Sequence, residues 1–573
     1  MSLALLAVLV LGVLTLGYTL YGRFLARLMA LSPDRPTPAV QVNDGGDFVP
    51  TPRFYLLGQH FSAIAAAGPI AGPILACQLF GWLPSILWIG LGVVFIGAVH
   101  DFTSLVSSVR HGARSIAEIM RENVSRRAWW AMLMFIWVAL IYVIVAFTDI
   151  TASTFVGVTQ EFPLQNVTFN AGGAVALAST MYLALAIVMG LVQRRWSPPL
   201  WLITAVFVPA TFVLVWLSTK VSTLFVFDSA KPIVLWGLII LAYCFAASLA
   251  PVWALLQPRG YLGGFVLYTA LAVGVIGVFF GNFEVAQEPF KTWTAVGAGG
   301  AAIPLFPFLF VTIACGACSG FHGLVCSGTT SKQIACESDS KMVGYGAMLL
   351  EAFVALIALA TVMIVASDKL QGLSPGTIYG NGMGTFLTVI IGEENRLFAI
   401  TFGAMAFSTF VFDTLDVATR LGRHIMQELF GWKGARGMVT ATAVTLAPAV
   451  FFISTAEKGA YLKFWTLFGT SNQLLASLTL LAITVWLMRT GRPYWFTAAP
   501  MFFVLSITLW ALSLQFRDFA RLVFEQGLLG ARDAAINGAA ALLLLFMTAL
   551  IIWEAYQTIG QTRAAMRAAQ PGD

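Results

Sequence analysis

The stretch ACGACSGFHGLVCSGTTSKQ, from Ala314 to Gln333, combines the position of a membrane span with the composition of a loop. It follows an apolar run that begins at Pro304, yet it contains four glycines, several hydroxyl side chains and His322. Each glycine weakens a helix by roughly 1 kcal/mol relative to alanine. Backbone groups released from a helix in hydrocarbon are costly unless protein or a water-filled cavity receives them. The stretch therefore predicts a broken helix that forms a site.

A second stretch of this kind, GQHFSAIAAAGPIAGPILACQ, occupies Gly58–Gln78. Gly68-Pro69 and Gly72-Pro73 interrupt its apolar run. Proline suits the first position of a helix, and the free amides there favour an anion by roughly 0.3–2 kcal/mol. Two interrupted spans in one chain are typical of a transporter with its substrate site between structural repeats.

The composition excludes a soluble globular protein. Hydrophobic residues make up 59% of the 573 residues and charged residues 10%, whereas average domains carry about 25% charged residues. The mean hydropathy is +0.85. The net charge of +6 does not indicate a nucleic-acid partner, because the basic residues lie in short loops beside apolar spans, where they set topology. The chain is therefore an integral membrane protein.

Windows of about 20 apolar residues predict about fifteen membrane spans in an all-α, polytopic fold. The windows are 3–21, 53–78, 82–108, 128–150, 173–193, 199–218, 232–255, 262–281, 304–328, 342–366, 397–419, 437–455, 461–487, 497–514 and 534–557. The Gly-rich segments 283–303 and 370–395 are expected to be external loops. Alternating the loops puts most basic residues on one side, which predicts an outside N-terminus and a cytoplasmic C-terminus.

With this topology the two broken spans run in opposite directions, as an inverted repeat requires. We expect their loose ends to face one another across a cavity. The predicted domains are a peripheral helix at 1–30, a first repeat with extra helices at 53–281, a second repeat at 304–487, and peripheral helices with a tail at 497–573. The broken segments are 58–78 in the first repeat and 314–333 in the second.

Ionisable residues inside spans cost roughly 2.5–3.5 kcal/mol each and need a partner or a function. His60 and His322 lie in or beside the broken stretches and can bind a carboxylate or relay a proton. Alternatively, they only donate to carbonyls freed by the break. Glu351 lies in the middle of a span, which favours function over structure.

Three aspartates, Asp101, Asp413 and Asp416, lie toward the ends of spans. In a coupled transporter such carboxylates bind sodium or take up a proton. The alternative is a structural ion pair at the cytoplasmic edge with Arg110, Arg420 or Arg423.

The hydroxyl run that contains Ser327, Thr329 and Thr330 can bind a cation through oxygen atoms. Its backbone amides, with Lys332, can instead bind an anion. Cys315-x-x-Cys318 has half of a metal-binding pattern, since no second such pair follows, and packing is the commoner role of small buried cysteines.

Four long motifs resemble the carbon starvation protein A (CstA) family of bacterial inner-membrane transporters: GQHFSAIAAAGPIAGPILA, GAVHDFTSLVSSVRHGARSIAEI, ACGACSGFHGLVCSGTTSKQIACESDSKMVGYGAMLLE and TFVFDTLDVATRLGRHIMQE. The resemblance covers nearly the whole chain. It implies the LeuT-like architecture of amino-acid transporters with five-helix inverted repeats. It also implies uptake of peptides or pyruvate during carbon starvation, and proton coupling for pyruvate. The chain departs from the family pattern at Cys318, Cys326 and Cys336.

We therefore expect a secondary active importer of a small carboxylate-bearing nutrient in the bacterial cytoplasmic membrane. The expected coupling ion is a proton, with sodium as the alternative. Membrane lipid is the other expected partner. No catalytic residue, metal, cofactor or nucleic acid is expected. The expected substrate-binding residues are His60, Gly68, Pro69, Gly72, Pro73, Ser319, Gly320, His322 and Lys332. The expected ion-coupling residues are Asp101, Asp413, Asp416, Ser327, Thr329, Thr330 and Glu351.

Two other functions fit the same sequence. One is a passive channel or a nutrient sensor with a transporter fold. The other is a membrane enzyme that uses the cysteine and histidine cluster with a metal or as thiols.

Overall fold

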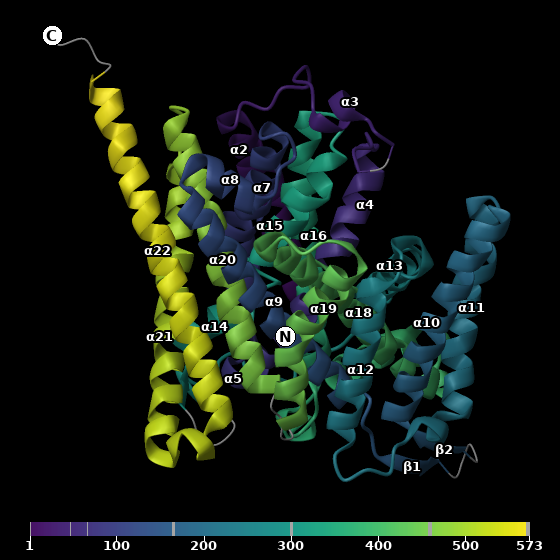
Figure 1. The fold of residues 1–573 in the computed structure, drawn as a ribbon. Helices are drawn as coiled ribbons and strands as arrows, with labels where there is room; N and C mark the ends of the chain where they lie inside the picture. The colour runs from purple at the N-terminus through teal and green to yellow at the C-terminus, as the bar shows by residue number, and fades with distance from the viewer. Residues whose placement is uncertain are drawn as a thin grey trace.

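The computed structural model describes residues 2–45, 47–65, 67–162, 167–297, 302–455 and 461–568, and it is a helical, multi-pass membrane protein (Figure 1). Within these residues, 13 helical segments are long and apolar enough to cross a membrane. They are Leu3–Leu28 (α1 Leu3–Leu16, η1 Gly17–Tyr21, α2 Gly22–Leu28), Trp82–Arg110 (α6 Trp82–Leu87, η2 Trp88–Gly97, α7 Ala98–Arg110), α9 (Arg126–Thr154), α10 (Ala171–Trp196), α11 (Leu200–Lys220), α12 (Pro232–Leu249), α13 (Leu256–Phe280), Glu337–Met363 (η8 Glu337–Asp339, η9 Lys341–Gly346, α16 Ala347–Met363), Glu393–Phe430 (η11 Glu393–Asn395, α18 Arg396–Phe430), α19 (Gly434–Thr455), α20 (Tyr461–Arg489), α21 (Trp495–Gly530) and α22 (Arg532–Ala568).

The remaining elements are short. They are α3 (Pro38–Val42), α4 (Arg53–Ile64), α5 (Gly68–Phe80), α8 (Ile116–Asn123), β1 (Thr159–Phe162), β2 (Val167–Asn170), η4 (Ser222–Phe225), η5 (Val252–Ala254), β3 (Thr294–Val296), β4 (Ala302–Pro304), α14 (Leu305–Thr312), α15 (Gly320–Gly328), η7 (Thr330–Lys332), η10 (Ser367–Leu370) and α17 (Pro375–Ile391). The strands form two small antiparallel hairpins, with Thr159 opposite Asn170 and Val296 opposite Ala302. The all-α, polytopic prediction is confirmed.

The centre of the protein is built around α9 and α20. The apolar windows of these helices are 89% and 94% buried, whereas that of α11 is 22% buried. A helix that is apolar all round and fully covered belongs to the core of a bundle. The first and the last two spans are each 33% buried. The division of the chain into two inverted repeats stays a prediction.

Both predicted broken spans are broken. The first consists of α4 and α5, which are bent by 49° relative to each other. The second consists of α14 and α15, with non-helical chain between Thr312 and Gly320. Counting the bent α4–α5 pair, the described residues contain up to 14 spans, against about fifteen predicted; the remaining window, 304–328, falls on the broken α14–α15 pair.

The two broken spans lie antiparallel and in contact. His60 Nδ1 is 2.8 Å from Thr330 Oγ1. Further along the first span, Gly68 lies against Cys315 and Gly72 against Thr312. Residue numbers therefore rise along one span as they fall along the other, which is the relative direction that the sequence predicts.

The expected external loop at 370–395 is wrong, because most of it is the helix α17. Ser374 caps this helix by accepting a hydrogen bond from the Thr377 amide at 3.3 Å. Gly376, Gly380 and Gly384 are spaced four residues apart on one face. They face Phe407, Ala404 and Ile400 of α18, with less room than a Cβ requires. These glycines permit close helix packing, although their number suggests a loop in the sequence.

Candidate functional site

The carbonyl groups freed at the second break are hydrogen-bonded by side chains from other helices. Trp465 Nε1 donates to the Thr312 carbonyl at 3.0 Å, and Trp88 Nε1 donates to the Ile313 carbonyl at 3.2 Å. Gln473 Nε2 donates to the Phe310 carbonyl at 2.9 Å. These freed carbonyls are thus bonded by tryptophan and glutamine side chains, and the alternative that His60 and His322 only hold freed carbonyls is wrong. Both histidines face other side chains.

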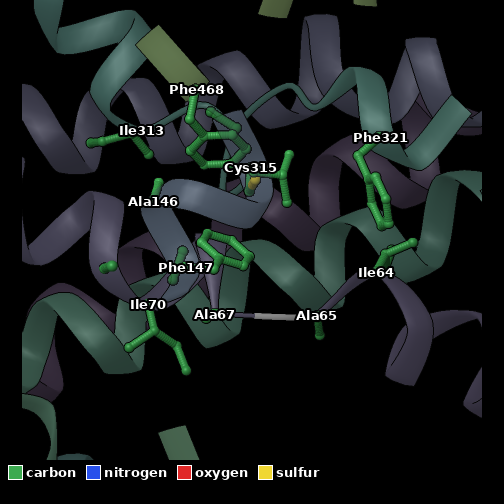
Figure 2. Packing of buried hydrophobic residues seen from close by; sticks show 14 of the residues in the cluster. Ile64, Ala65, Ala67, Ile70, Ala146, Phe147, Ile313, Cys315, Phe321 and Phe468 are labelled. Atoms are coloured by element: carbon green, nitrogen blue, oxygen red, sulfur yellow. The ribbon is translucent and has the colours of Figure 1, made fainter. Parts of the chain in front are cut away.

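At the level of the breaks the two spans pack against each other directly. Figure 2 shows Ala65 and Ala67 on either side of the first break, near Phe147 of α9 and near Cys315 of the second break. A Cβ at Gly68 would overlap the Cys315 side chain. The expected cavity between the loose ends is thus replaced by a packed apolar contact in this conformation. Ala66 lies outside the described residues.

Two large cavities lie on either side of this contact. One has a volume of about 980 Å³ and is lined by α4, including His60 and Ala63, and by Arg259, Asp413 and Thr330. The other has a volume of about 1010 Å³ and is lined by the end of α5, α9, the start of α17 and α18. The breaks therefore separate one cavity along the first half of the first span from another along its second half.

A row of acids and histidines lies beside the second broken span. His322 of α15 stands between two carboxylates: Nδ1 is 2.9 Å from Oδ2 of Asp101, and Nε2 is 3.2 Å from Oε2 of Glu351. Asp101 belongs to α7 and Glu351 to α16. All three side chains are at most 1% exposed. Three helices thus bring together residues that the sequence assigned to substrate binding and ion coupling.

One further histidine, His100, extends this row, and another, His60, lies close to it. His100 Nδ1 is 2.8 Å from Oδ1 of Asp101, and its Nε2 has no hydrogen-bond partner among the described residues. On the opposite side Cys326 Sγ donates to the Asp101 carbonyl at 3.5 Å and lies 3.8 Å from His60 Nε2. His60 in turn contacts Thr330 and lines the cavity of about 980 Å³. We call Asp101, His100, His322 and Glu351 the acid–histidine row.

The two contacts of His322 set how many protons the acid–histidine row holds. A neutral imidazole carries one N–H, but both nitrogens of His322 face carboxylates. A second proton, on His322 or on Glu351, is needed for both contacts to be attractive. Without it two buried carboxylates would share the site with no positive charge, which is strongly unfavourable. The two contacts of His322 are therefore both attractive only when the group holds one proton more than a neutral imidazole carries.

A second group of buried charges forms around Arg259. Its Nε is 2.8 Å from Oδ1 of Asp413, and its Nη1 contacts Oδ2 of Asp416. Tyr243 donates to Asp416 Oδ2 at 2.9 Å, and Tyr182 donates to the Arg259 carbonyl at 2.8 Å. We call these five residues the arginine network. Asp413 remains 26% exposed and lines the same cavity as His60.

The predicted partners of these aspartates are wrong. Arg110 pairs with Glu337, at 2.7 Å. Arg420 and Arg423 donate to backbone carbonyls near the end of α12, those of Ala247, Ser248 and Ala250. The sequence missed Arg259 because its span was expected to begin at residue 262, which left the arginine in a loop. The helix α13 begins at Leu256 instead.

Asn472 is another residue that the sequence missed. Its Oδ1 accepts a hydrogen bond from the Phe321 amide at 2.9 Å, and its Nδ2 donates to Ser319 Oγ at 3.0 Å. Asn472 therefore holds the first turn of α15, and Gly320 packs closely against its backbone. The polar run Ser471-Asn472-Gln473 inside an apolar span was a signal that could have identified it.

The remaining predicted residues lie at the edges of the site. Ser327 donates to the Gly323 carbonyl and accepts from the Ile116 amide, so it joins α15 to α8. Thr329 lines the cavity of about 980 Å³. Lys332 is not brought into the site: its Nζ lies 3.0 Å from Oδ2 of Asp47, which is 73% exposed.

Pro69 and Pro73 are buried in α5, and Pro69 lies in its first turn. Cys315 and Cys318 are buried free thiols. Within the part of the chain that the structure describes, no group of three or more His, Cys, Asp or Glu side chains could hold a metal ion.

Comparison with known proteins gives one family. Residues 2–381 and 370–511 match the family described as carbon starvation protein CstA. A peptide transporter CstA of Helicobacter pylori is 33% identical over 87% of this chain and 80% of its own length. A pyruvate/proton symporter BtsT of Escherichia coli is 31% identical over 88% of this chain and 80% of its own.

One solved structure, a manganese transporter from Eremococcus coleocola, aligns with a TM-score of 0.45 at 15% identity and covers 91% of this chain and 99% of its own. The sequence matches establish that the chain belongs to the carbon starvation protein CstA family and that it is a transporter.

Proposed function

We propose that this CstA-family protein is a proton-coupled importer of a small carboxylate-bearing nutrient, either pyruvate or a short peptide. The observation that carries the proposal is the buried acid–histidine row beside the second broken span. The names of the relatives, a peptide transporter and a pyruvate/proton symporter, support the two substrate classes. Import would serve a bacterium during carbon starvation.

The coupling step is the gain and loss of one proton in the acid–histidine row. In the proposed step a protonated Glu351, whose Oε2 lies 3.2 Å from Nε2 of His322 without an aligned hydrogen bond in this conformation, rotates to donate its O–H to that nitrogen, while the Nδ1–H of His322 donates to Asp101. Loss of that proton turns the Glu351–His322 contact from a hydrogen bond into a repulsion between a carboxylate and a lone pair. Because the two residues lie on α16 and α15, the proton decides whether these helices stay in contact.

With the N-terminus outside, the cavity of about 980 Å³ lies on the cytoplasmic half of the first broken span, and the imported substrate leaves the breaks through it. This volume lies in the range of ligand pockets, about 300–1,000 Å³, and accommodates a short peptide as well as pyruvate. His60 and Thr330 lie where the cavity meets the second span, and Arg259 adds a positive charge to its wall. In the opposite state the substrate would bind from the cavity of about 1010 Å³, which is the pattern of alternating access.

The proposed location is the bacterial cytoplasmic membrane, with the N-terminus outside. The end of the protein that carries Arg35, Arg110 and Arg492 then faces the cytoplasm, in accord with the positive-inside rule. The cavity that contains His60 lies along α4, the half of the first broken span that is nearer to this arginine-bearing end.

Uptake into proteoliposomes tests the proposal. Labelled pyruvate and a labelled dipeptide are offered separately, under an imposed pH gradient and under an imposed sodium gradient. The proposal expects accumulation of one substrate above equilibrium with the pH gradient and none with sodium alone. Accumulation driven only by sodium would transfer the coupling to that ion.

A passive channel or sensor would give no accumulation under either gradient. The packed contact between the breaks, which separates the two cavities, favours a transporter over an open channel.

A further inference from the structure

A third pocket lies at the surface, away from the acid–histidine row and the arginine network. It has a volume of about 380 Å³, and three arginines line it together with Trp486 and Thr490. Each arginine comes from a different part of the chain. Arg35 follows the first span, Arg110 ends α7, and Arg492 lies in the turn between α20 and α21.

One carboxylate opposes these three charges among the described residues. Glu337 is fully buried, and its oxygens lie 2.6 Å from Arg35 Nη1 and 2.7 Å from Arg110 Nε. Three guanidinium groups against one carboxylate leave a local surplus of two positive charges. Burial and the nearby Arg110 and Arg35 lower the pKa of Arg492 below its ordinary value, as expected for crowded positive charge.

The arginines also retain unused hydrogen-bond donors. The Arg110 side chain is 8% exposed, and its Nη1 has no hydrogen-bond partner in the described part of the chain. Its Nη2 donates to the Met29 carbonyl at 2.7 Å, and Arg492 Nη1 donates to the same carbonyl at 3.2 Å. Arg110 lines the pocket, and its unpaired guanidinium nitrogen is a hydrogen-bond donor that an anion would satisfy.

We infer that this pocket binds a phosphate group. A phosphate dianion matches the surplus of two charges, and the planar guanidinium binds phosphate oxygens through paired hydrogen bonds. The volume of about 380 Å³ holds a phosphate with a small organic substituent. The phosphate belongs either to a soluble phosphomonoester or to a lipid headgroup, since both present the same oxygens.

A bound phosphate would connect helices that carry the acid–histidine row. Arg110 ends α7, which carries Asp101, and Glu337 begins the span that carries Glu351. An anion that holds Arg35, Arg110 and Arg492 together would fix the surface end of α7 relative to α16. The pocket is thus placed to respond to phosphate on the proposed cytoplasmic side.

Titration of inorganic phosphate into the full-length protein in nanodiscs of neutral phosphatidylcholine tests the inference. Isothermal calorimetry should show saturable binding. The double variant Arg35→Gln/Arg492→Gln should raise the dissociation constant at least about tenfold, which corresponds to 1.4 kcal/mol. The matched control Arg396→Gln/Arg517→Gln removes the same charge from exposed positions and should leave the constant unchanged.

Nanodiscs with phosphatidic acid, whose headgroup is a phosphomonoester, separate the two sources of phosphate. Competition of this lipid with inorganic phosphate, together with loss of retained lipid in the Arg35→Gln/Arg492→Gln variant by native mass spectrometry, identifies a headgroup site. Unchanged phosphate binding identifies a soluble ligand. Absence of phosphate binding in the neutral nanodiscs together with equal lipid retention by all variants would overturn the inference. Equal losses in the double variant and its control would do the same.

Discussion

The acid–histidine row and the arginine network each hold two carboxylates among the membrane helices, but positive charge reaches these carboxylates in different ways. In the row, Asp101 and Glu351 face His322, whose charge depends on a proton. In the network, Asp413 and Asp416 face Arg259, which stays charged at all physiological pH values. The row therefore changes charge with proton supply, while the network holds a fixed charge. The proposed function therefore assigns the coupling proton to the carboxylates beside a histidine and a structural role to those beside an arginine.

The largest effect is expected from removing the fixed charge. Arg259→Met leaves Asp416 fully buried, and Asp413 at the cavity wall, without their cation, which should destabilise the protein by about 3–5 kcal/mol. Thermal unfolding in detergent measures the loss. The triple variant with Asp413→Asn and Asp416→Asn removes all three charges and should recover much of the stability. A single variant as stable as the parent would show that the network does not depend on Arg259.

The next effect concerns the proton of the row. Glu351→Gln keeps the shape of the side chain but cannot release a proton, so accumulation should fall to equilibrium. A pH difference of one unit drives about tenfold accumulation, or 1.36 kcal/mol, for one proton per substrate. The internal-to-external ratio of labelled substrate in proteoliposomes is the measurement. Glu393→Gln, an exposed acid paired with Arg396, is the control and should accumulate normally. Accumulation by Glu351→Gln at the parent level would remove Glu351 from the coupling.

A smaller effect is expected from Asn472, which is hydrogen-bonded to the first turn of α15. Asn472→Ala removes the hydrogen bond to the Phe321 amide and should destabilise the protein by about 1 kcal/mol. Thermal unfolding again measures the change. Asn395 precedes α18 without a capping hydrogen bond from its side chain, so Asn395→Ala should have less effect. Equal effects of the two substitutions would argue against a specific capping role.

The smallest effect is expected from a substitution in the arginine network, and it tests whether the network takes part in coupling. Asp416→Asn leaves Arg259 paired with Asp413, one positive against one negative charge, so no charge loses its partner. Accumulation should remain within about threefold of the parent, equivalent to about 0.7 kcal/mol. Complete loss of accumulation, with the protein still folded, would show that the coupling proton belongs to the network and would support the predicted ion-coupling role of Asp413 and Asp416.

The sequence predicted the spans, both broken helices and their opposite directions because these depend on local composition and on the alternation of loops. It also placed His322, Asp101 and Glu351 among the functional residues, since an ionisable group in a span needs a partner. It could not predict which partner. Asp101 and His322 are 221 residues apart, and their contact depends on how α7 packs against α15.

Two errors have a common cause. The arginine at 259 was interpreted as a loop residue and the segment 370–395 as a loop, because charge is costly inside a membrane and glycine is a poor helix former. In the structure, partners from other helices stabilise both segments as helix. Two aspartates pair with Arg259, and α18 packs against the glycines of α17. Composition alone does not reveal such compensation between distant segments.

The two indole rings that hold the second break give the protein a built-in optical reporter. Trp88 and Trp465 donate their N–H groups to the carbonyls of Ile313 and Thr312 in a dry interior. A rearrangement that pulls the broken span away from α20 must separate the Trp465 donor from its acceptor, and one that pulls it away from η2 must do the same for Trp88. Indole emission shifts to longer wavelength in a wetter environment. In a variant that keeps only these two of the 17 tryptophans, the transport cycle should therefore be visible in the intrinsic fluorescence, with no dye attached.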